Sequence, residues 1–163
     1  MLLKGSCHCR KVTFEVESEN YYPYQLCYCS ICRKVNGSGG FGINISAKAK
    51  TLKVKGRQYL GIYRARLWHE KKKGQRVPIS TGRRHFCKAC GSGLWLFDPS
   101  WPKLLHPYAS AIDTPLPVPP AHTHLLLDSK APWVTVHPNK DDKVFDHYPD
   151  ESIADWHKRM GLP

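Results

Sequence analysis

The sequence has no apolar run that approaches the roughly 20 residues needed to cross a bilayer. Its first residues, Met1 to Gly5, contain no long apolar region of the kind found in secretory signal peptides. There is no internal repeat and no glycine-rich nucleotide-binding fingerprint. We therefore expect a cytoplasmic protein without membrane contact, in which residues 1–163 form a single domain.

Acidic residues are also scarce: 13 Asp and Glu stand against 25 Lys and Arg, which gives a net charge of +12. Such an excess favours anionic partners, either small carboxylate-bearing molecules or nucleic acid. The basic residues are spread along the chain, and Lys71–Lys73 is the only tight run of three, within the basic segment 69–76. A run of this kind is most often a solvated loop, so charge alone does not identify the partner.

Helical periodicity is rare, whereas short alternating stretches are common. Val12, Phe14 and Val16 alternate with polar residues, as in a half-buried strand. Further strands are expected over 24–29, 41–45, 51–55, 58–64, 94–97, 104–110, 123–127 and 143–147. A short helix is expected over 31–35 with Ser30 as N-cap, and a C-terminal helix over 152–160. Many short strands, separated by glycine and proline turns, predict an all-β, sandwich-like fold.

Seven cysteines fall in three tight groups, CxC at 7 and 9, CxCxxC at 27, 29 and 32, and CxxC at 87 and 90. An odd number does not suit a closed disulfide framework. In a reducing compartment such clusters indicate metal sites or redox motifs. Thiolates are soft, anionic ligands that bind zinc with tetrahedral geometry. The spacing therefore predicts zinc binding.

Cys27, Cys29 and Cys32, which we call the trio, offer three sulfurs within six residues. Cys27 and Cys29 share a face at the end of the expected strand, and the following turn can bring Cys32 to the same point. Three protein ligands leave one tetrahedral position open, which a catalytic zinc needs and a structural zinc avoids. The trio is therefore the candidate catalytic site.

Cys87-x-x-Cys90-Gly91 is half of a zinc knuckle and needs two more ligands. Pairing it with Cys7 and Cys9 uses every thiol and gives one closed site of four sulfurs, which we call the quartet, beside the trio. Alternatively, two members of the trio could complete the half-site of Cys87 and Cys90. The simplest alternative is a single four-thiolate zinc with three spare thiols. Spacing favours two sites, of which the closed one is structural.

Several motifs together resemble one known family. Gly5-Ser-Cys-His-Cys9, Cys27-x-Cys-x-x-Cys-Arg-Lys34, Phe86-Cys-x-x-Cys-Gly-Ser92 and Ser129-Lys-Ala-Pro-Trp133 occur in this order over nearly the whole chain. This pattern resembles the glutathione-dependent formaldehyde-activating enzymes, a family that includes the centromere protein V type domain. The resemblance implies a β-rich, tent-like zinc fold. It also implies a structural zinc on Cys7, Cys9, Cys87 and Cys90, and a second, labile zinc on the trio.

The resemblance further implies an enzyme of the carbon–sulfur lyase type, with glutathione as co-substrate and S-(hydroxymethyl)glutathione as the adduct formed with formaldehyde. The basic segment 69–76 and the prolines of 115–120 lie where loops can reshape the pocket. At class level, the expected reaction makes or breaks a carbon–sulfur bond in a thiol adduct. Arg33 and Lys34 follow the trio directly and are candidates to pair with the carboxylates of the thiol substrate.

Two other functions fit parts of the sequence. A non-enzymatic zinc module that binds nucleic acid or protein would explain the positive charge, although it needs only closed zinc sites. Cys29-x-x-Cys32 also matches a thioredoxin-like redox pair, but that motif belongs in a βαβ unit and the surrounding pattern is rich in strands.

Overall fold

The computed structural model describes residues 1–163 and contains twelve strands in three sheets, two α-helices and five short 3-10 turns. The all-β class predicted from the alternating patterns is confirmed. The 3-10 turns are Ala49–Thr51, Arg57–Tyr59, Trp68–Glu70, Ala109–Ala111 and Leu127–Ser129. No helix combines the length and the apolar character needed to cross a bilayer.

The first sheet consists of three antiparallel strands in the order β1-β2-β6. Their bounds are Leu2–Ser6, Thr13–Glu17 and Lys53–Lys55. The strand expected around Phe14 is therefore present, whereas β1 lies where no strand was expected. Gly5 allows β1 to approach its neighbours closely, because a Cβ there would lie 2.4 Å from the Phe14 ring and 2.5 Å from the Ala111 carbonyl oxygen.

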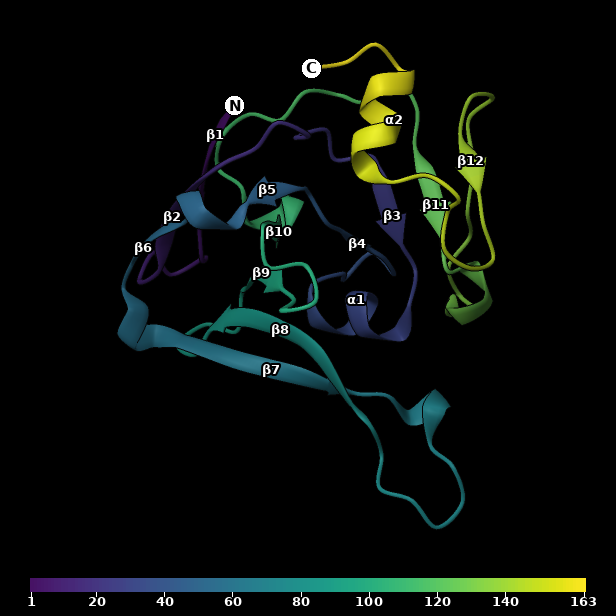
Figure 1. Ribbon diagram of the computed structural model, residues 1–163, viewed down its shortest axis with the longest axis horizontal. Coiled ribbons are helices and arrows are strands. Elements are labelled where there is room, and N and C mark those ends of the chain that lie inside the picture. The colour runs from purple at the N-terminus through teal and green to yellow at the C-terminus, as the bar shows by residue number, and fades with distance from the viewer.

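The second sheet has five antiparallel strands in the order β5-β10-β9-β8-β7. The strands are β5 (Ala47–Lys48), β7 (Leu60–Arg66), β8 (Ile79–Cys87), β9 (Gly93–Phe97) and β10 (Leu104–Pro107). Figure 1 shows β7 and β8 as a long hairpin whose connecting segment projects away from the rest of the molecule. The strand expected over 58–64 is therefore present and continues to Arg66, which pairs with Ile79 of β8, a strand that was not expected.

The third sheet is mixed, with the order β12-β11-β3-β4. It contains β3 (Gln25–Cys27), β4 (Gly42–Ile43), β11 (Thr123–Leu125) and β12 (Lys143–Val144). β11 runs parallel to both β3 and β12, while β4 is antiparallel to β3. This sheet brings the segment that leads into the trio beside a strand almost a hundred positions later in the chain.

Two short α-helices flank this third sheet (Figure 1). α1 (Ser30–Val35) follows β3 directly, and its N-cap is Cys29, whose sulfur accepts a hydrogen bond from the Cys32 amide at 3.3 Å. The prediction that Ser30 caps this helix was wrong, because Ser30 is already its first helical residue. α2 (Ile153–Arg159) has the predicted cap, since the Asp155 amide donates to the Ser152 hydroxyl at 3.1 Å.

The main hydrophobic core lies between the first and second sheets. Its thirteen buried residues include Cys7 and Cys87, as well as the edge-to-face pair of Phe14 and Trp95, whose ring centroids are 5.1 Å apart. A smaller cluster contains Cys27, Cys32 and Leu125. The two groups of cysteines are thus built into different parts of the interior.

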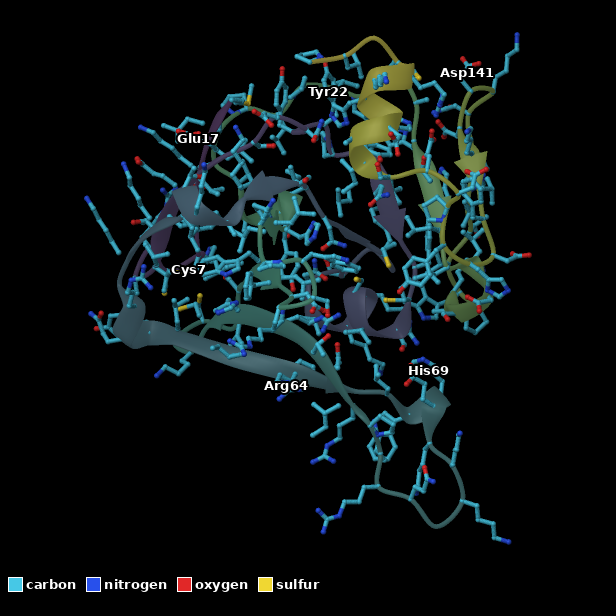
Figure 2. The ribbon with its side chains drawn as sticks, in the orientation of Figure 1. Cys7, Glu17, Tyr22, Arg64, His69 and Asp141 are labelled. Atoms are coloured by element: carbon cyan, nitrogen blue, oxygen red, sulfur yellow. The ribbon has the colours of Figure 1, made fainter.

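The end of β7 and the segment that connects it to β8 carry a group of exposed basic residues. Arg64, Arg66 and the lysines of 71–73 are all exposed, and so are Tyr63 and Trp68. Figure 2 shows Arg64 on β7 and His69 at the start of the projecting segment, both away from Cys7. We call residues 62–79 the basic arm.

Candidate zinc centres and the adjoining cavity

The quartet is assembled from two turns. Cys7 follows β1, Cys9 lies in the turn before β2, Cys87 ends β8 and Cys90 lies in the turn before β9. Their four sulfurs all lie within 4.8 Å of one another. The Sγ atoms of Cys7 and Cys9 are 3.6 Å apart, and those of Cys9 and Cys87 are 3.8 Å apart.

These distances match a tetrahedral zinc site. Four sulfurs that are each about 2.3 Å from one ion lie about 3.8 Å from one another. Of the two possible partner sets for Cys87 and Cys90, the structure brings Cys7 and Cys9 to them and keeps the trio apart. The residues present therefore fit one four-thiolate zinc.

Local backbone geometry shapes both turns of the quartet. Gly91 has a φ of +77° and donates its amide to the Cys87 carbonyl at 2.8 Å, and Arg10 has a φ of +60° and donates to the Cys7 carbonyl at 2.9 Å. The Val12 amide also donates to the Cys7 sulfur at 3.3 Å. Amide donors of this kind favour thiolate over thiol.

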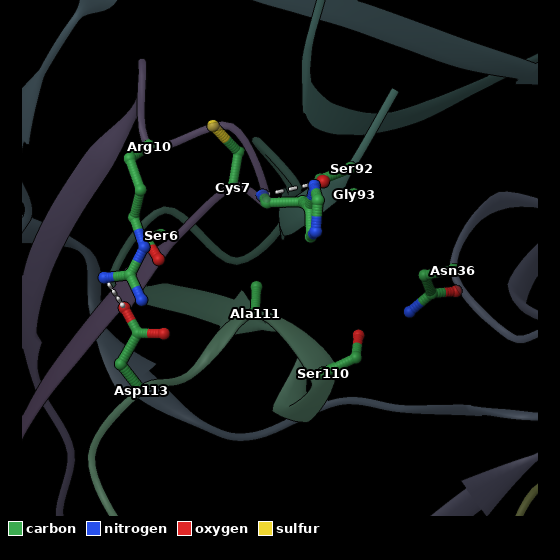
Figure 3. A pocket seen from close by; sticks show the side chains of 10 residues that line it. Ser6, Cys7, Arg10, Asn36, Ser92, Gly93, Ser110, Ala111 and Asp113 are labelled. Carbon is green, nitrogen blue, oxygen red and sulfur yellow. Dashed lines mark hydrogen bonds and ion pairs between the residues drawn. The ribbon is translucent and has the colours of Figure 1, made fainter. Parts of the chain in front are cut away.

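A polar cavity of about 370 Å³ lies beside the quartet (Figure 3). It is bordered by Cys7, by the ion pair of Arg10 and Asp113 at 3.8 Å, and by Ser92, whose hydroxyl accepts from the His8 amide at 3.1 Å. The Ser92 hydroxyl also lowers the pKa of Cys90 to about 5. These contacts tie the two turns of the quartet together.

The trio comes from one continuous segment. Cys27 ends β3, Cys29 caps α1 and Cys32 lies within that helix, and their sulfurs are all within 4.8 Å of one another. Hydrogen bonds from the thiols of Cys27 and Cys32, together with amides of the first helical turn, lower the pKa of Cys29 to about 2. No fourth cysteine, histidine or carboxylate belongs to this cluster. The donor set fits zinc with one ligand position left for another molecule.

The residue between the first two trio cysteines anchors the segment. The Tyr28 amide donates to the Leu125 carbonyl at 3.0 Å, and the Tyr28 hydroxyl lies 3.0 Å from Nδ1 of His124. Nε2 of His124 lies 3.3 Å from Asp142. These buried contacts give His124 a structural role. They lie on the side of the segment opposite to the sulfurs.

A second cavity, also of about 370 Å³, adjoins the trio, and all three trio cysteines line it. Its walls come from β3, α1, β8, β9, β10 and β11, and from residues 148–153 before and at the start of α2. Most of the lining is hydrophobic, including Leu96, Trp101 and Leu125. A thiol that enters this cavity therefore meets the three sulfurs in a largely apolar setting.

The few polar groups in the trio cavity were not singled out by the sequence. They include Arg84, Asn44 and His106, and the Asn44 amide donates to the Cys32 sulfur at 3.9 Å. Burial lowers the pKa of His106, so this ring is neutral at neutral pH. Arg33 and Lys34, proposed from their position after the trio, are not among the lining residues. The sequence offered one hint for Arg84: it is a charged residue in the segment that leads to Cys87, a candidate zinc ligand.

The geometry also bears on the redox alternative. A thioredoxin-like pair would place its two cysteines in a βαβ unit, but β4 returns antiparallel to β3. In addition, Cys27 brings a third sulfur to the same point. The arrangement is that of a ligand cluster.

Comparison with known proteins gives consistent results. The sequence profile of the family described as "Glutathione-dependent formaldehyde-activating enzyme" matches residues 2–126. A Halomonas elongata protein named "Putative glutathione-dependent formaldehyde-activating enzyme" is 52% identical over 162 residues, 99% of this chain and 98% of the relative. A crystal structure of a Rhodobacter sphaeroides protein matches with a TM-score of 0.51 at 28% identity, covering 70% of this chain and 91% of that one.

Proposed function

Because the chain belongs to the glutathione-dependent formaldehyde-activating enzyme family, we propose that it is an enzyme that makes or breaks a carbon–sulfur bond in a glutathione adduct. The proposed reaction is the addition of glutathione to formaldehyde to give S-(hydroxymethyl)glutathione, or its reverse. The sulfur–carbon bond forms, the carbonyl π bond breaks, and the thiol proton ends on the new hydroxyl oxygen. No oxidant or reductant is needed.

The observation that carries this proposal is the position of the trio. Its three sulfurs line a cavity and include no fourth protein ligand, whereas the quartet is complete. A zinc ion held by Cys27, Cys29 and Cys32 would supply the positive charge that keeps a bound thiol deprotonated at neutral pH. The quartet would hold a structural zinc.

The chain's own residues prepare the cavity for this chemistry. The thiols of Cys27 and Cys32 and, to a lesser extent, the Cys32 amide that α1 presents to the Cys29 sulfur lower the pKa of Cys29 and favour its thiolate form. The apolar walls around Leu96 and Leu125 give the reacting sulfur and carbon atoms a largely hydrophobic surrounding. The Asn44 amide donates to the Cys32 sulfur at 3.9 Å and contributes to its orientation.

The test is the rate of S-(hydroxymethyl)glutathione formation and breakdown, followed by exchange NMR with ¹³C-formaldehyde and glutathione. The zinc-loaded protein should accelerate this exchange above the spontaneous rate, and Cys29→Ser should return it to that rate. Ser38→Ala, an exposed change just beyond α1, serves as the matched control. An exchange rate that is equal with and without the wild-type protein would refute the assignment.

Nucleic-acid binding is a second candidate, and the basic arm favours it. The arm presents exposed lysines and arginines interleaved with the exposed rings of Tyr63 and Trp68. If it binds DNA or RNA, affinity should fall steeply with salt and weaken when Lys71, Lys72 and Lys73 are changed to glutamine, while Cys29→Ser leaves it unchanged. Micromolar binding at 50 mM salt that is absent at 200 mM would support this second activity.

A further inference from the structure

Arg84 is a buried charge without a protein partner. It lies on β8, only 8% of its surface is exposed, and its Nη1 atom has no hydrogen-bond partner. None of the nine ion pairs in the chain includes it. Burying a guanidinium is costly unless an anion and hydrogen-bond acceptors compensate it. We therefore expect a molecule outside the protein chain to supply the missing hydrogen-bond acceptor for the Arg84 guanidinium.

The acidic groups in the neighbourhood are engaged by other residues. Asp98 accepts from the Thr81 hydroxyl and from the Ser100 amide, each at 2.9 Å. Glu151, which lines the same cavity, is paired with Arg159 at 2.6 Å and Lys143 at 3.4 Å. Neither carboxylate lies within ion-pair distance of Arg84.

The trio sulfurs do not satisfy the guanidinium either. Cys32 accepts from the Asn44 amide, and the Cys29 sulfur accepts from the Cys32 amide, but no hydrogen bond joins a trio sulfur to Arg84. Arg84 nevertheless lines the cavity that the three sulfurs line. The exposed part of the guanidinium side chain therefore borders the molecule that occupies that cavity, while Nη1 itself is covered by the surrounding side chains.

We propose that Arg84 binds a carboxylate of the thiol substrate and so anchors that substrate beside the trio, an inference that rests on the proposed function. A guanidinium pairs with a carboxylate through two parallel N–H···O bonds, which gives both affinity and orientation. Asn44 adds a buried Oδ1 without a donor in the same cavity. A free cationic donor together with a free acceptor matches a peptide-like thiol that carries carboxylates and amide N–H groups.

The experiment measures the binding and turnover of three thiols. These are glutathione, its glycine carboxamide, and its analogue with the γ-glutamyl α-carboxylate converted to an amide. Wild-type protein should bind one of the two amides about 10- to 100-fold more weakly than glutathione, and that amide identifies the carboxylate in contact. Calorimetry gives the dissociation constants, and metal content is matched between preparations.

Arg84→Gln should bind glutathione more weakly than wild type by the same factor. It should bind glutathione and the sensitive amide with equal affinity. KM should rise while kcat changes less than about threefold, because the contact exists in the ground state and in the transition state alike. Arg84→Lys should recover part of the affinity but not the bidentate geometry. Arg83→Gln, at the exposed neighbouring position of β8 and outside the cavity lining, is the matched control and should behave as wild type.

Several outcomes would overturn the assignment. Equal binding of all three thiols by wild-type protein would do so even if Arg84→Gln failed to fold. A drop in kcat with unchanged KM would place Arg84 at the reacting oxygen instead. If Arg84→Gln matches wild type while Cys29→Ser is inactive, the carboxylate contact is wrong and the proposed reaction stands. If Cys29→Ser keeps full exchange activity, the proposed reaction itself fails.

Discussion

Cys87 and Cys29 lie in different sulfur clusters, so replacing them should have different consequences. Cys87→Ser removes a ligand from the main core and should destabilise the protein by more than about 3 kcal/mol, since structural zinc binding contributes directly to folding. Cys29→Ser should cost less than about 1 kcal/mol, because serine is itself a good N-cap and can accept from the Cys32 amide. Urea denaturation of the zinc-loaded variants compares the two values. Equal losses would contradict the division into a structural and a catalytic cluster.

His157 makes a pH-dependent contribution to stability. Its side chain is buried, Nδ1 donates to the Ile153 carbonyl at 2.9 Å, and Nε2 has no partner. Burial lowers the pKa of His157 below its usual value near 6.5. The unfolded chain therefore takes up this proton first as pH falls, so the contribution of His157 is present above pH 6.5 and is lost below it.

The measurement is urea unfolding at pH 7.5, 6.5 and 5.5 for wild type and His157→Asn. Asparagine keeps a donor for the Ile153 carbonyl but does not titrate. Wild type should lose stability more steeply than the variant below pH 6.5, by at most about 1.4 kcal/mol per pH unit. Changes common to both proteins, including weaker thiolate–metal binding at low pH, cancel in the comparison. Parallel pH profiles would show that the folded protein takes up the His157 proton as readily as the unfolded chain does, so that folding does not lower this pKa.

At the residue level, the two cysteine clusters were predictable but the polar wall of the trio cavity was not. Ligand spacing is a local property of the chain, and the four-plus-three division follows from using every thiol. Arg84, Asn44 and His106 come from β8, a loop next to β4, and β10, and nothing in their local sequence shows that they converge. Arg33 and Lys34 were predicted to contact the substrate because they directly follow the trio in sequence, but they do not line the cavity.

At the level of secondary structure, most strand positions were predicted, but their pairing was not. Alternation located β2, which buries one face, and short runs between turn residues located β7, β9 and the region of β11. The parallel alignment of β11 with β3 joins segments far apart in sequence, and two-residue strands such as β5 have no periodicity to detect. These pairings depend on the packing of the whole chain.

Helix α2 is attached to the third sheet mainly through Trp156. This side chain is 1% exposed and stacks on Tyr24, with ring centroids 3.7 Å apart and planes 6° from parallel. The start of the same helix contributes Ser152 and Ile153 to the wall of the trio cavity. The packing of α2 therefore connects stability to the cavity in which we propose that the substrate binds.

Trp156→Ala should lower the free energy of unfolding by about 3–5 kcal/mol, because it removes a buried aromatic side chain and leaves a cavity. It should also raise KM for glutathione, since a loosened α2 no longer closes that wall. Trp156→Phe, which keeps an aromatic ring against Tyr24, should retain most of both properties. Unfolding curves and steady-state kinetics on the two variants provide the check. An unchanged KM in a folded Trp156→Ala protein would show that α2 does not shape the site.

At the scale of the whole molecule, the two sulfur clusters should lose metal in separate steps. The quartet joins turns 78 positions apart in the chain and holds together the first two sheets, so its zinc should leave only when the fold is lost. The trio supplies three ligands from one short segment and opens to a cavity, so its zinc should be removed first.

A chelator titration followed by a zinc-sensitive dye, circular dichroism and the formaldehyde exchange assay should therefore show two phases. The first phase should abolish activity with the spectrum intact and be reversed by added zinc, and the second should unfold the protein. Simultaneous loss of metal, activity and ellipticity in a single phase would mean that the trio is as much a part of the fold as the quartet.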